Sequence, residues 1–328
     1  MCCLMASGGL LGQQQGVFSQ QGNGFLTYNP GFTGAEKFGM VSFGQRAQWV
    51  GFKDAPVQQY LNYSTRLRKS VVDTILPPSL PMSDNSLYEP LGTPTVKKEH
   101  LPHGLGIMML RDEYGPFSKM SAMVNYAHHF YLNGVNLGAG IGIGATYTDI
   151  LEGKLSVLED GDELYNSYIQ QNALSYHMDA SFGAVAYNKN FYVGYSISQM
   201  LLNKPFVKLN EEVAYQLRMH HMLNASYVFR LSKAIEIAPT LDAMTLASAP
   251  SALSIGCKAR LLQTFWGAFN YRFGQAINTR IGFKAFNHVI INYSYEWATT
   301  AVQQFSSGTH EIGITITFNS HKTPKHLW

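Results

Sequence analysis

The stretch LGAGIGIGATYTD, Leu137–Asp149, decides the fold. Glycines recur at every second position over 138–144, and apolar residues fill the positions between them. Because successive side chains of a strand point to opposite faces, this period predicts a strand with one apolar face and one bare face. Gly140, Gly142 and Ala145 also satisfy the G-x-G-x-x-A dinucleotide fingerprint, but that motif needs a turn followed by a helix. No helical period follows, so we interpret the stretch as a strand and not as a phosphate-binding loop.

The composition favours a protein whose strands cross a membrane. Charged residues make up 14% of the 328 residues and aromatic residues 13%, whereas soluble domains carry about 25% charged residues. No uninterrupted apolar run approaches the roughly 20 residues that a membrane helix needs. A transmembrane β-barrel reconciles these features. Its strands alternate apolar and polar residues, so the mean hydropathy of a strand stays low although one of its faces is apolar. The net charge of +3 and the lack of basic clusters interleaved with aromatic residues argue against nucleic-acid binding.

Alternating segments recur along the chain after Lys37, and most reach the roughly 9–11 residues needed to cross a bilayer obliquely. Strands of a soluble sandwich average about 5–6 residues. The segments are 38–48, 57–66, 103–112, 118–130, 134–149, 173–188, 190–200, 220–230, 233–243, 251–260, 263–273, 277–286, 288–297 and 310–318. Their even number fits a closed antiparallel barrel of the bacterial outer-membrane type, so we predict a barrel of about fourteen strands.

The connections between these segments tend to alternate between short and long, which predicts short periplasmic turns and long outer loops. Residues 67–102 break this rule, because a proline-rich insert falls where a periplasmic turn is due, and we expect it to be extended or disordered.

Phe318 should end the last strand and form part of the assembly signal. The expected parts are a partial signal-peptide remnant at 1–14, an irregular lead-in at 15–37, the barrel at 38–318 and a dispensable tail at 319–328.

Chemistry-bearing residues give little sign of catalysis or metal binding. Cys2, Cys3 and Cys257 supply neither a disulfide framework nor a metal set. The EDGDE run at 159–163 could hold calcium, but it lacks EF-hand spacing and reads better as a solvated loop. His128–His129 are adjacent in a strand and point to opposite faces, so they cannot chelate one ion together. A Ser/His/Asp triad stays open, since its members need not be close in sequence. We expect no enzyme activity, no cofactor and no metal site.

Blocks of sequence along the whole chain point to a family. They are FLTYNPGFTG at 25–34, QRAQWVGFKDAPVQQYLNYS at 45–64, GLGIMMLRDEYGP at 104–116, FYVGYSISQML at 191–201, HHMLNASYVF at 220–229, a block over 249–272, IINYSYEW at 290–297 and SSGTHEIGITITF at 306–318. In this order they resemble the PorP/SprF family of outer-membrane proteins from Bacteroidetes. The resemblance spans nearly the whole mature chain, and only the insert and the C-terminal tail depart from it.

The resemblance implies a non-enzymatic outer-membrane component of the type IX secretion system and gliding machinery. Such a barrel works with other components in the periplasm and outer membrane, or retains a secreted adhesin at the surface, while outer-membrane lipid surrounds it. The motif residues that the resemblance marks as structural or docking positions are Asn29, Pro30, Gly34, Trp49, Gly51, Phe52, Asp112 and Gly115. Physically, Asn-Pro and Gly34 punctuate a lead-in that could enter the lumen, where the glycine face leaves room for a backbone.

A barrel alone equally permits a diffusion pore or a transporter of hydrophobic compounds. The charged residues on the inward face could line such a channel or pin a plug within it. They are Arg46, Arg111 or Asp112, Lys258, Arg260, Arg272, Lys284 and Glu296. Both functions therefore stay open at the level of sequence.

Overall fold

The computed structural model describes most of the chain. The described residues are 26–36, 38–72, 96–154, 175–201, 208–209, 212–213, 219–246, 249–286 and 288–318. Among them, no helix combines the length and the apolar character needed to cross a bilayer.

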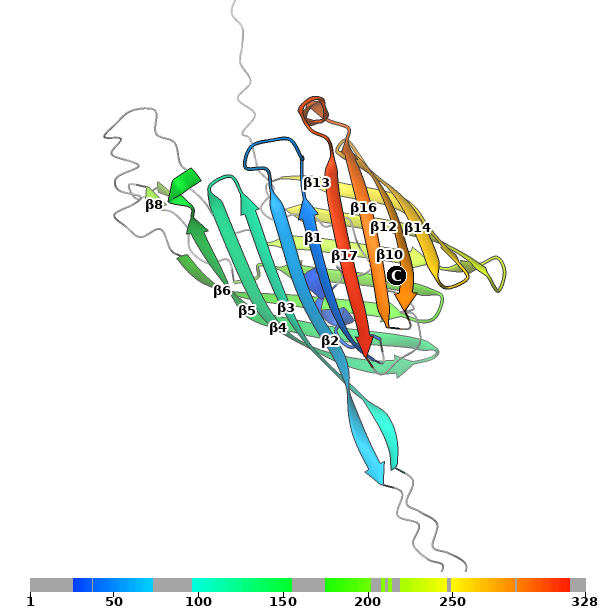
Figure 1. Cartoon of the computed structure of the whole chain (residues 1–328). Coiled ribbons are helices and arrows are strands. Elements are labelled where there is room, and N and C mark those ends of the chain that lie inside the picture. The colour runs from blue at the N-terminus through cyan, green and yellow to red at the C-terminus, as the bar shows by residue number, and fades with distance from the viewer. Residues whose placement is uncertain are drawn as a thin grey trace, which may run out of the picture.

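Within the described residues, fourteen long antiparallel strands close into a barrel (Figure 1), as the sequence predicts. They are β1 Gly39–Ala47, β2 Val57–Val72, β3 Val96–Tyr114, β4 Phe117–Leu132, β5 Val135–Ile150, β6 Ser175–Tyr187, β7 Phe191–Ser198, β10 His220–Tyr227, β12 Ile235–Leu246, β13 Ala249–Leu261, β14 Phe265–Arg272, β15 Ala276–Phe286, β16 Val289–Ala298 and β17 Thr309–Phe318. The shorter elements are β8 Lys208–Leu209, β9 Glu212–Val213, β11 Phe229–Arg230, η1 Pro30–Phe32, η2 Glu152–Lys154 and η3 Ala301–Phe305.

The barrel closes where its first and last long strands meet. β1 pairs with β17 from Gly39 opposite Phe318 to Ala47 opposite His310. On the far side of the barrel, β10 pairs with both β7 and β12. Closure leaves every long strand with two neighbours, which is how a β-structure satisfies its backbone in lipid.

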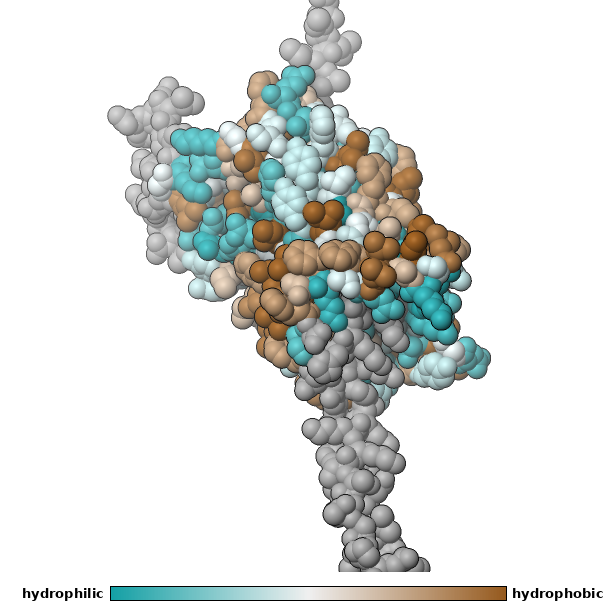
Figure 2. Space-filling model, turned by 45° about the vertical axis from the view of Figure 1, so that its right-hand side comes forward, coloured by the Kyte–Doolittle hydropathy of each residue, from teal (hydrophilic) through white to brown (hydrophobic). Residues whose placement is uncertain are grey.

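The two faces of the strands have opposite character. In β17, Thr315 and Thr317 are buried while Ile314 and Ile316 are each 40% exposed. Apolar side chains point away from the lumen, the reverse of a water-soluble protein. Figure 2 shows brown, apolar side chains gathering across the middle of the visible face. This band is the surface that meets the membrane hydrocarbon.

The two ends of the barrel differ in their connections. We call one the short-turn end: it carries turns such as 133–134 and 188–190, the start of β1 and the end of β17. The other, the long-loop end, carries the connections 48–56 and 299–308. The assignment of the short-turn end to the periplasm stays a prediction.

The insert predicted at 67–102 is shorter than expected. β2 and β3 continue past the barrel as a two-stranded ribbon that pairs Arg68 with His100 and Val72 with Val96 (Figure 1). The register shifts between Arg66 and Arg68, and Pro102 lies opposite this irregularity, where a strand tolerates a residue without an amide hydrogen. The remaining part, 73–95, lies outside the described residues.

Residues 26–36 lie inside the barrel. Every one of them is buried, from Leu26 to Glu36, and in Figure 1 they form the blue coil behind β1. Within them, the short helix η1 contacts the strands β4, β5, β6 and β7. These residues are the described part of the lead-in predicted at 15–37, and from here on we use the name lead-in for residues 26–36 alone. The other predicted segments, 1–14 and 319–328, lie outside the described residues.

Candidate functional site

The lead-in makes a compact turn that its own sequence encodes. The Asn29 side-chain oxygen accepts a hydrogen bond from the Gly31 amide at 2.9 Å and caps η1. Pro30 takes the first position of the turn, where its fixed φ is favourable and no amide hydrogen is needed. Gly34 has a φ of +72°, a conformation that costs glycine little. The motif NPGFTG therefore forms one capped 3-10 turn followed by a residue of positive φ within the lumen.

The glycine face receives the backbone of this turn. A Cβ atom on Gly140 would lie 2.5 Å from the Pro30 carbonyl carbon and closer still to its oxygen. A Cβ on Gly138 would lie 2.8 Å from the Gly31 oxygen. Gly183 of β6 faces the same turn, because its Cβ would lie 2.8 Å from the Gly31 amide nitrogen. The interpretation that the glycine face at 138–144 provides room for the lead-in backbone is confirmed for Gly138 and Gly140, whereas Gly142 and Gly144 face atoms of the neighbouring strands β4 and β6.

Asn29 joins the turn to two strands. Its side chain is completely buried, and its amide nitrogen donates to the carbonyl oxygens of Ala184 at 3.4 Å and Tyr195 at 3.3 Å. A Cβ on Gly194 of β7 would lie 3.0 Å from that nitrogen. One asparagine thus both caps the turn and binds the barrel wall.

A second group of contacts holds the end of the lead-in nearer β1. The Gly34 amide donates to the Ser64 hydroxyl at 2.8 Å. His129 Nε2 lies 2.8 Å from the Thr33 oxygen, so this nitrogen carries the hydrogen and donates. His129 Nδ1 is then free to accept from the Tyr187 hydroxyl, 3.1 Å away. The Ala35 oxygen lies 3.4 Å from the same hydroxyl and is the alternative acceptor of its single hydrogen. These bonds fix the lead-in to β2, β4 and β6.

A third group holds the opposite end of the lead-in. The Asn62 amide donates to the Thr27 hydroxyl at 3.0 Å. Tyr28 packs in a buried apolar cluster with Tyr60, Met108, Leu110 and Met123. A polar cavity of about 40 Å³ lies beside them, and Asp112, Lys119 and Asp179 are among its lining residues. A water molecule takes up about 30 Å³ and drug-sized ligands need roughly 300 Å³ or more, so this cavity suits water.

Ion pairs cross the lumen wall near the closing seam. Arg46 of β1 donates to Glu296 of β16 at 2.8 Å, and both side chains are nearly inaccessible, at 2% and 7% exposed. Arg272 of β14 lies 3.3 Å from the other oxygen of the same carboxylate. Because β17 lies between β1 and β16, the Arg46–Glu296 pair bridges three strands across the seam.

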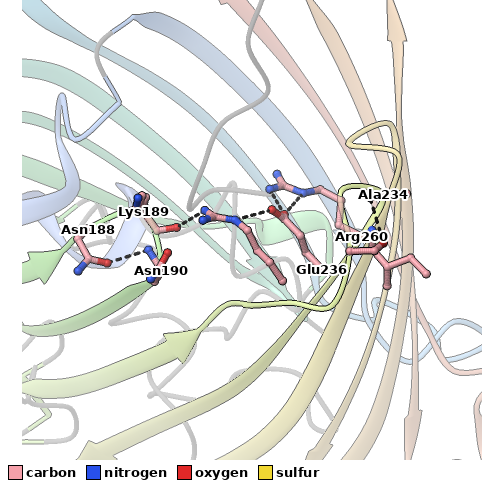
Figure 3. A network of polar contacts seen from close by, with 9 residues as sticks. Asn188, Lys189, Asn190, Ala234, Glu236 and Arg260 are labelled. Atoms are coloured by element: carbon pink, nitrogen blue, oxygen red, sulfur yellow. Dashed lines mark hydrogen bonds and ion pairs between the residues drawn. The ribbon is translucent and has the colours of Figure 1, made fainter.

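A second carboxylate is shared by two arginines nearer the short-turn end (Figure 3). Glu236 of β12 accepts from Arg230 Nε at 3.1 Å and from Arg260 Nε at 2.8 Å. Arg230 also donates to the Lys189 carbonyl oxygen at 3.0 Å. The network links the turn after β6 to β11, β12 and β13. Its charges are paired with one another rather than lining an open passage.

The predicted motif residues fall into two places. Asn29, Pro30 and Gly34 belong to the lead-in, and Asp112 is 7% exposed on the inner face of β3. Arg111, the alternative inward residue, is on the outer face, where its side chain is 56% exposed and pairs with Glu113. The interior group therefore consists of three residues of the lead-in and of Asp112, which lines the cavity beside Thr27 and Tyr28.

The other motif residues shape the long-loop end. Trp49, Gly51 and Gly115 have φ values of +52°, +112° and +56°, and the Phe52 side chain is 41% exposed. Backbone bonds join their loop to its neighbours, from the Val50 amide to the Gly308 oxygen at 2.9 Å and from the Gly115 amide to the Asp54 oxygen at 3.1 Å. Trp49, Gly51 and Phe52 lie in the loop 48–56 and Gly115 in the neighbouring turn between β3 and β4, and all four lie outside the lead-in.

The other inward charges are mostly placed as predicted. Lys258 and Arg260 are buried, while Lys284 is half-buried on the same face of β15 as the buried Arg280. Sequence reasoning missed Arg280 and Glu236, although each lies next to an isoleucine and so alternates with the apolar outer face of its strand. The isolated glycines Gly183 and Gly194 and the polar partners Asn62 and His129 were also missed, because face periodicity does not name a side chain's neighbour.

Among the described residues, no group of three or more His, Cys, Asp or Glu side chains is arranged to hold a metal ion. His129 is buried and His128 is half-exposed, so the pair points to opposite faces as expected. Cys257 is exposed on the outer face of β13. The EDGDE run lies outside the described residues.

A family model described as "Type IX secretion system membrane protein PorP/SprF" matches residues 10–316. The chain belongs to the PorP/SprF family. Membership and the closed barrel place this PorP/SprF protein in the bacterial outer membrane, as a membrane protein of the type IX secretion system.

Other comparisons concern the barrel outline. No curated protein matches this PorP/SprF chain. Among solved structures it is similar to the Ralstonia pickettii toluene transporter TbuX, at 8% identity and a TM-score of 0.47 over 92% of this chain and 94% of that one. It is also similar to the P. putida toluene transporter TodX, at 9% identity and 0.45 over 90% and 93%. For the Acinetobacter baumannii outer membrane protein Omp33 the values are 8% and 0.42 over 87% and 99%. Similarities at this level say nothing about function.

Phe318 ends β17 with its side chain 44% exposed toward the membrane, opposite Gly39 of β1. Phe318→Ala should lower the amount of barrel in the outer membrane, because the terminal aromatic residue is predicted to be part of the assembly signal. Deleting 319–328 should leave that amount unchanged. Immunoblots of outer-membrane fractions compare the two. Equal losses would show that the tail is needed for assembly.

Proposed function

We propose that this PorP/SprF protein is a closed, non-enzymatic component of the type IX secretion system and gliding machinery. It links periplasmic partners or holds a secreted adhesin at the cell surface. The observation that carries the proposal is the occupied lumen: the chain's own lead-in lies within the barrel, fastened through Asn29, Gly34 and Thr33. A barrel filled by its own chain offers surfaces to partners rather than a passage to solutes.

The charged wall supports the same conclusion. Glu296 is shared by Arg46 and Arg272, and Glu236 by Arg230 and Arg260. A selective pore uses unpaired charge to attract ions into a constriction. Here each carboxylate is paired with two guanidinium groups of the wall, so these charges have partners within the barrel.

The ribbon formed by β2 and β3 is the part proposed to meet periplasmic partners. β1 stops pairing with β2 at Ser64, and β4 stops pairing with β3 at His103. Beyond these residues, neither ribbon strand pairs with a further strand within the described part of the chain, and an extended segment of a partner could pair with such an edge by strand addition. The ribbon projects from the short-turn end, the predicted periplasmic side (Figure 1).

Planar-bilayer recording tests the closed lumen. Purified wild-type protein should insert with little or no steady conductance, because the lead-in fills the barrel. Heat-modifiable migration of the same sample confirms that the barrel is folded. Large and steady conductance at every insertion would instead favour a pore or a transporter of hydrophobic compounds.

A deletion strain separates the two partner roles. General loss of type IX export would support the linking role, and loss of one surface adhesin with other export intact would support the anchoring role. Normal export and adhesin display, together with impaired uptake of a solute, would overturn the proposal in favour of a transporter.

A further inference from the structure

The outer wall of the barrel carries a row of polar side chains across three adjacent strands, β1, β2 and β3 (Figure 1). Gln45 of β1 lies opposite Gln59 of β2, and Gln59 lies opposite Arg111 of β3. Residues two apart in a strand share a face, so the three lie on the same outer face as Phe43 and Leu61, which are 40% and 43% exposed. We call Gln45, Gln59 and Arg111 the polar row.

The polar row is confined to these three strands. The register continues it through Ile312 of β17 on one side and Met120 of β4 on the other, and each of these side chains is 50% exposed. Beyond Met120 the same register reaches Tyr147 of β5 and Tyr176 of β6. The flanking wall therefore presents the apolar and aromatic side chains that suit lipid.

Apolar residues also lie above and below the glutamines along their own strands. One step nearer the long-loop end, Ala47 of β1 lies opposite Val57 of β2. One step in the other direction, Phe43 lies opposite Leu61. On β1 and β2 the glutamine pair thus interrupts an apolar wall instead of marking the place where that wall ends.

The polar row has hydrogen-bonding capacity that its own barrel leaves unused. Gln59 Nε2 donates to Gln45 Oε1 at 3.1 Å. In the part of the chain that the structure describes, the second amide atom of each glutamine has no protein partner. Arg111 pairs with Glu113, and one carboxylate leaves some of the five guanidinium donors over. Polar groups without partners are costly in an apolar medium, so a hydrogen-bonding surface is favoured over lipid tails at this wall.

A second copy of the same chain fits the polar row, because the row is complementary to itself. Two copies in one membrane share their orientation, and the commonest symmetry for such a pair is a two-fold axis, here along the membrane normal. An axis beside Gln59, the middle member, brings Gln59 of both copies together. It also brings Arg111 of each copy toward Gln45 of the other. Amides donate and accept while a guanidinium only donates, so every group meets one that it can bond.

The same axis keeps like charges apart. Arg111 lies on β3, to one side of the axis, and the symmetry operation carries Arg111 of the second copy to the opposite side. Neighbouring strands are about 4.8 Å apart, so each guanidinium faces the amide side of the other copy across the axis. An uncharged centre with one donor group on either side is thereby compatible with two-fold contact.

We infer that the protein associates with a second copy of itself in the outer membrane, through the outer wall of β1–β3 with the polar row at the centre. The exposed side chains of Phe43, Leu61 and Met109 surround the row and pack against their counterparts. The ribbons of the two copies, which continue β2 and β3, then project from the same side of the dimer. The contact involves neither the lumen nor the orientation of the barrel, so it is independent of both.

Cross-linking in outer membranes tests the dimer. Cells express two copies of the full chain that carry different epitope tags, in a background of Cys2→Ser, Cys3→Ser and Cys257→Ser. Val57→Cys places a thiol on β2, beside the inferred axis, and leaves the polar row intact. Thr245→Cys is the matched control, because Thr245 is exposed on the outer face of β12, across the barrel from β2. A short bis-maleimide is the cross-linker.

Val57→Cys should give a product that has the mass of two chains and carries both tags, whereas Thr245→Cys should give none. Adding Gln59→Leu and Arg111→Leu to Val57→Cys should remove the product, while heat-modifiable migration shows that the barrel is still folded. A product of another mass with one tag would mean that a different protein covers this wall, and no product from folded Val57→Cys would mean that lipid covers it. Either result, or a product that survives the two leucine substitutions, would overturn the inference.

Discussion

Gly140→Val should open the lumen of the purified barrel. A Cβ at this position would lie 2.5 Å from the Pro30 carbonyl carbon, so the valine methyl groups have no place while the lead-in stays where it is. The obstacle is backbone rather than the flexible end of a side chain. Overpacking of this kind typically costs about 1–3 kcal/mol. The barrel wall is continuous with its neighbours on both sides, so we expect the lead-in to move.

Planar-bilayer recording should therefore show steady conductance for Gly140→Val and little for wild type. Gly267→Val is the matched control, since Gly267 is on the outer face of β14 and the nearest atom to an added Cβ, the Arg280 oxygen, is 3.6 Å away. The control should stay closed. A folded, heat-modifiable Gly140→Val barrel that stays as closed as wild type would show that the lead-in does not seal the lumen.

The fourteen strands could be predicted from the sequence because lipid imposes one rule on all of them. Each strand must present an apolar outer face, so β17 alternates Ile312, Ile314 and Ile316 with polar residues throughout its length. The rule applies within each strand separately, so it can be recognised in the sequence before the neighbouring strands are known. Register and closure follow once alternation and turn lengths are fixed.

The ribbon and the contacts of the lead-in could not be predicted in the same way. Prolines favoured an unpaired insert over 67–102, but an irregularity in the ladder accommodates Pro102 while the strands continue. The glycines at 138–144 stand out as a row, whereas β6 and β7 contribute the single glycines Gly183 and Gly194 to the same contact. Their role exists only after three strands meet. Likewise, the contacts of the lead-in depend on partners that are 30 or more residues away in the sequence.

Glu296→Gln should weaken the barrel more than any other single change among the ion pairs described above. Glu296 receives Arg46 from β1 and Arg272 from β14, and the Arg46–Glu296 pair is nearly inaccessible to solvent. Loss of the carboxylate charge leaves two guanidinium groups in the lumen without their shared partner. Breaking a buried ion pair from one side typically costs about 3–5 kcal/mol, and here the pair also holds β1 to β16 across the closing seam.

The measurement is the temperature at which the compact, heat-modifiable gel band converts to the unfolded one, and it should fall clearly for Glu296→Gln. Glu113→Gln is the matched control, because Glu113 pairs with Arg111 at a site where the arginine is 56% exposed. Exposed pairs contribute about 0–1 kcal/mol, so the control should convert near the wild-type temperature. If both variants convert together, solvent and the remaining polar groups of the lumen replace the lost charge, and the seam is held by its backbone ladder alone.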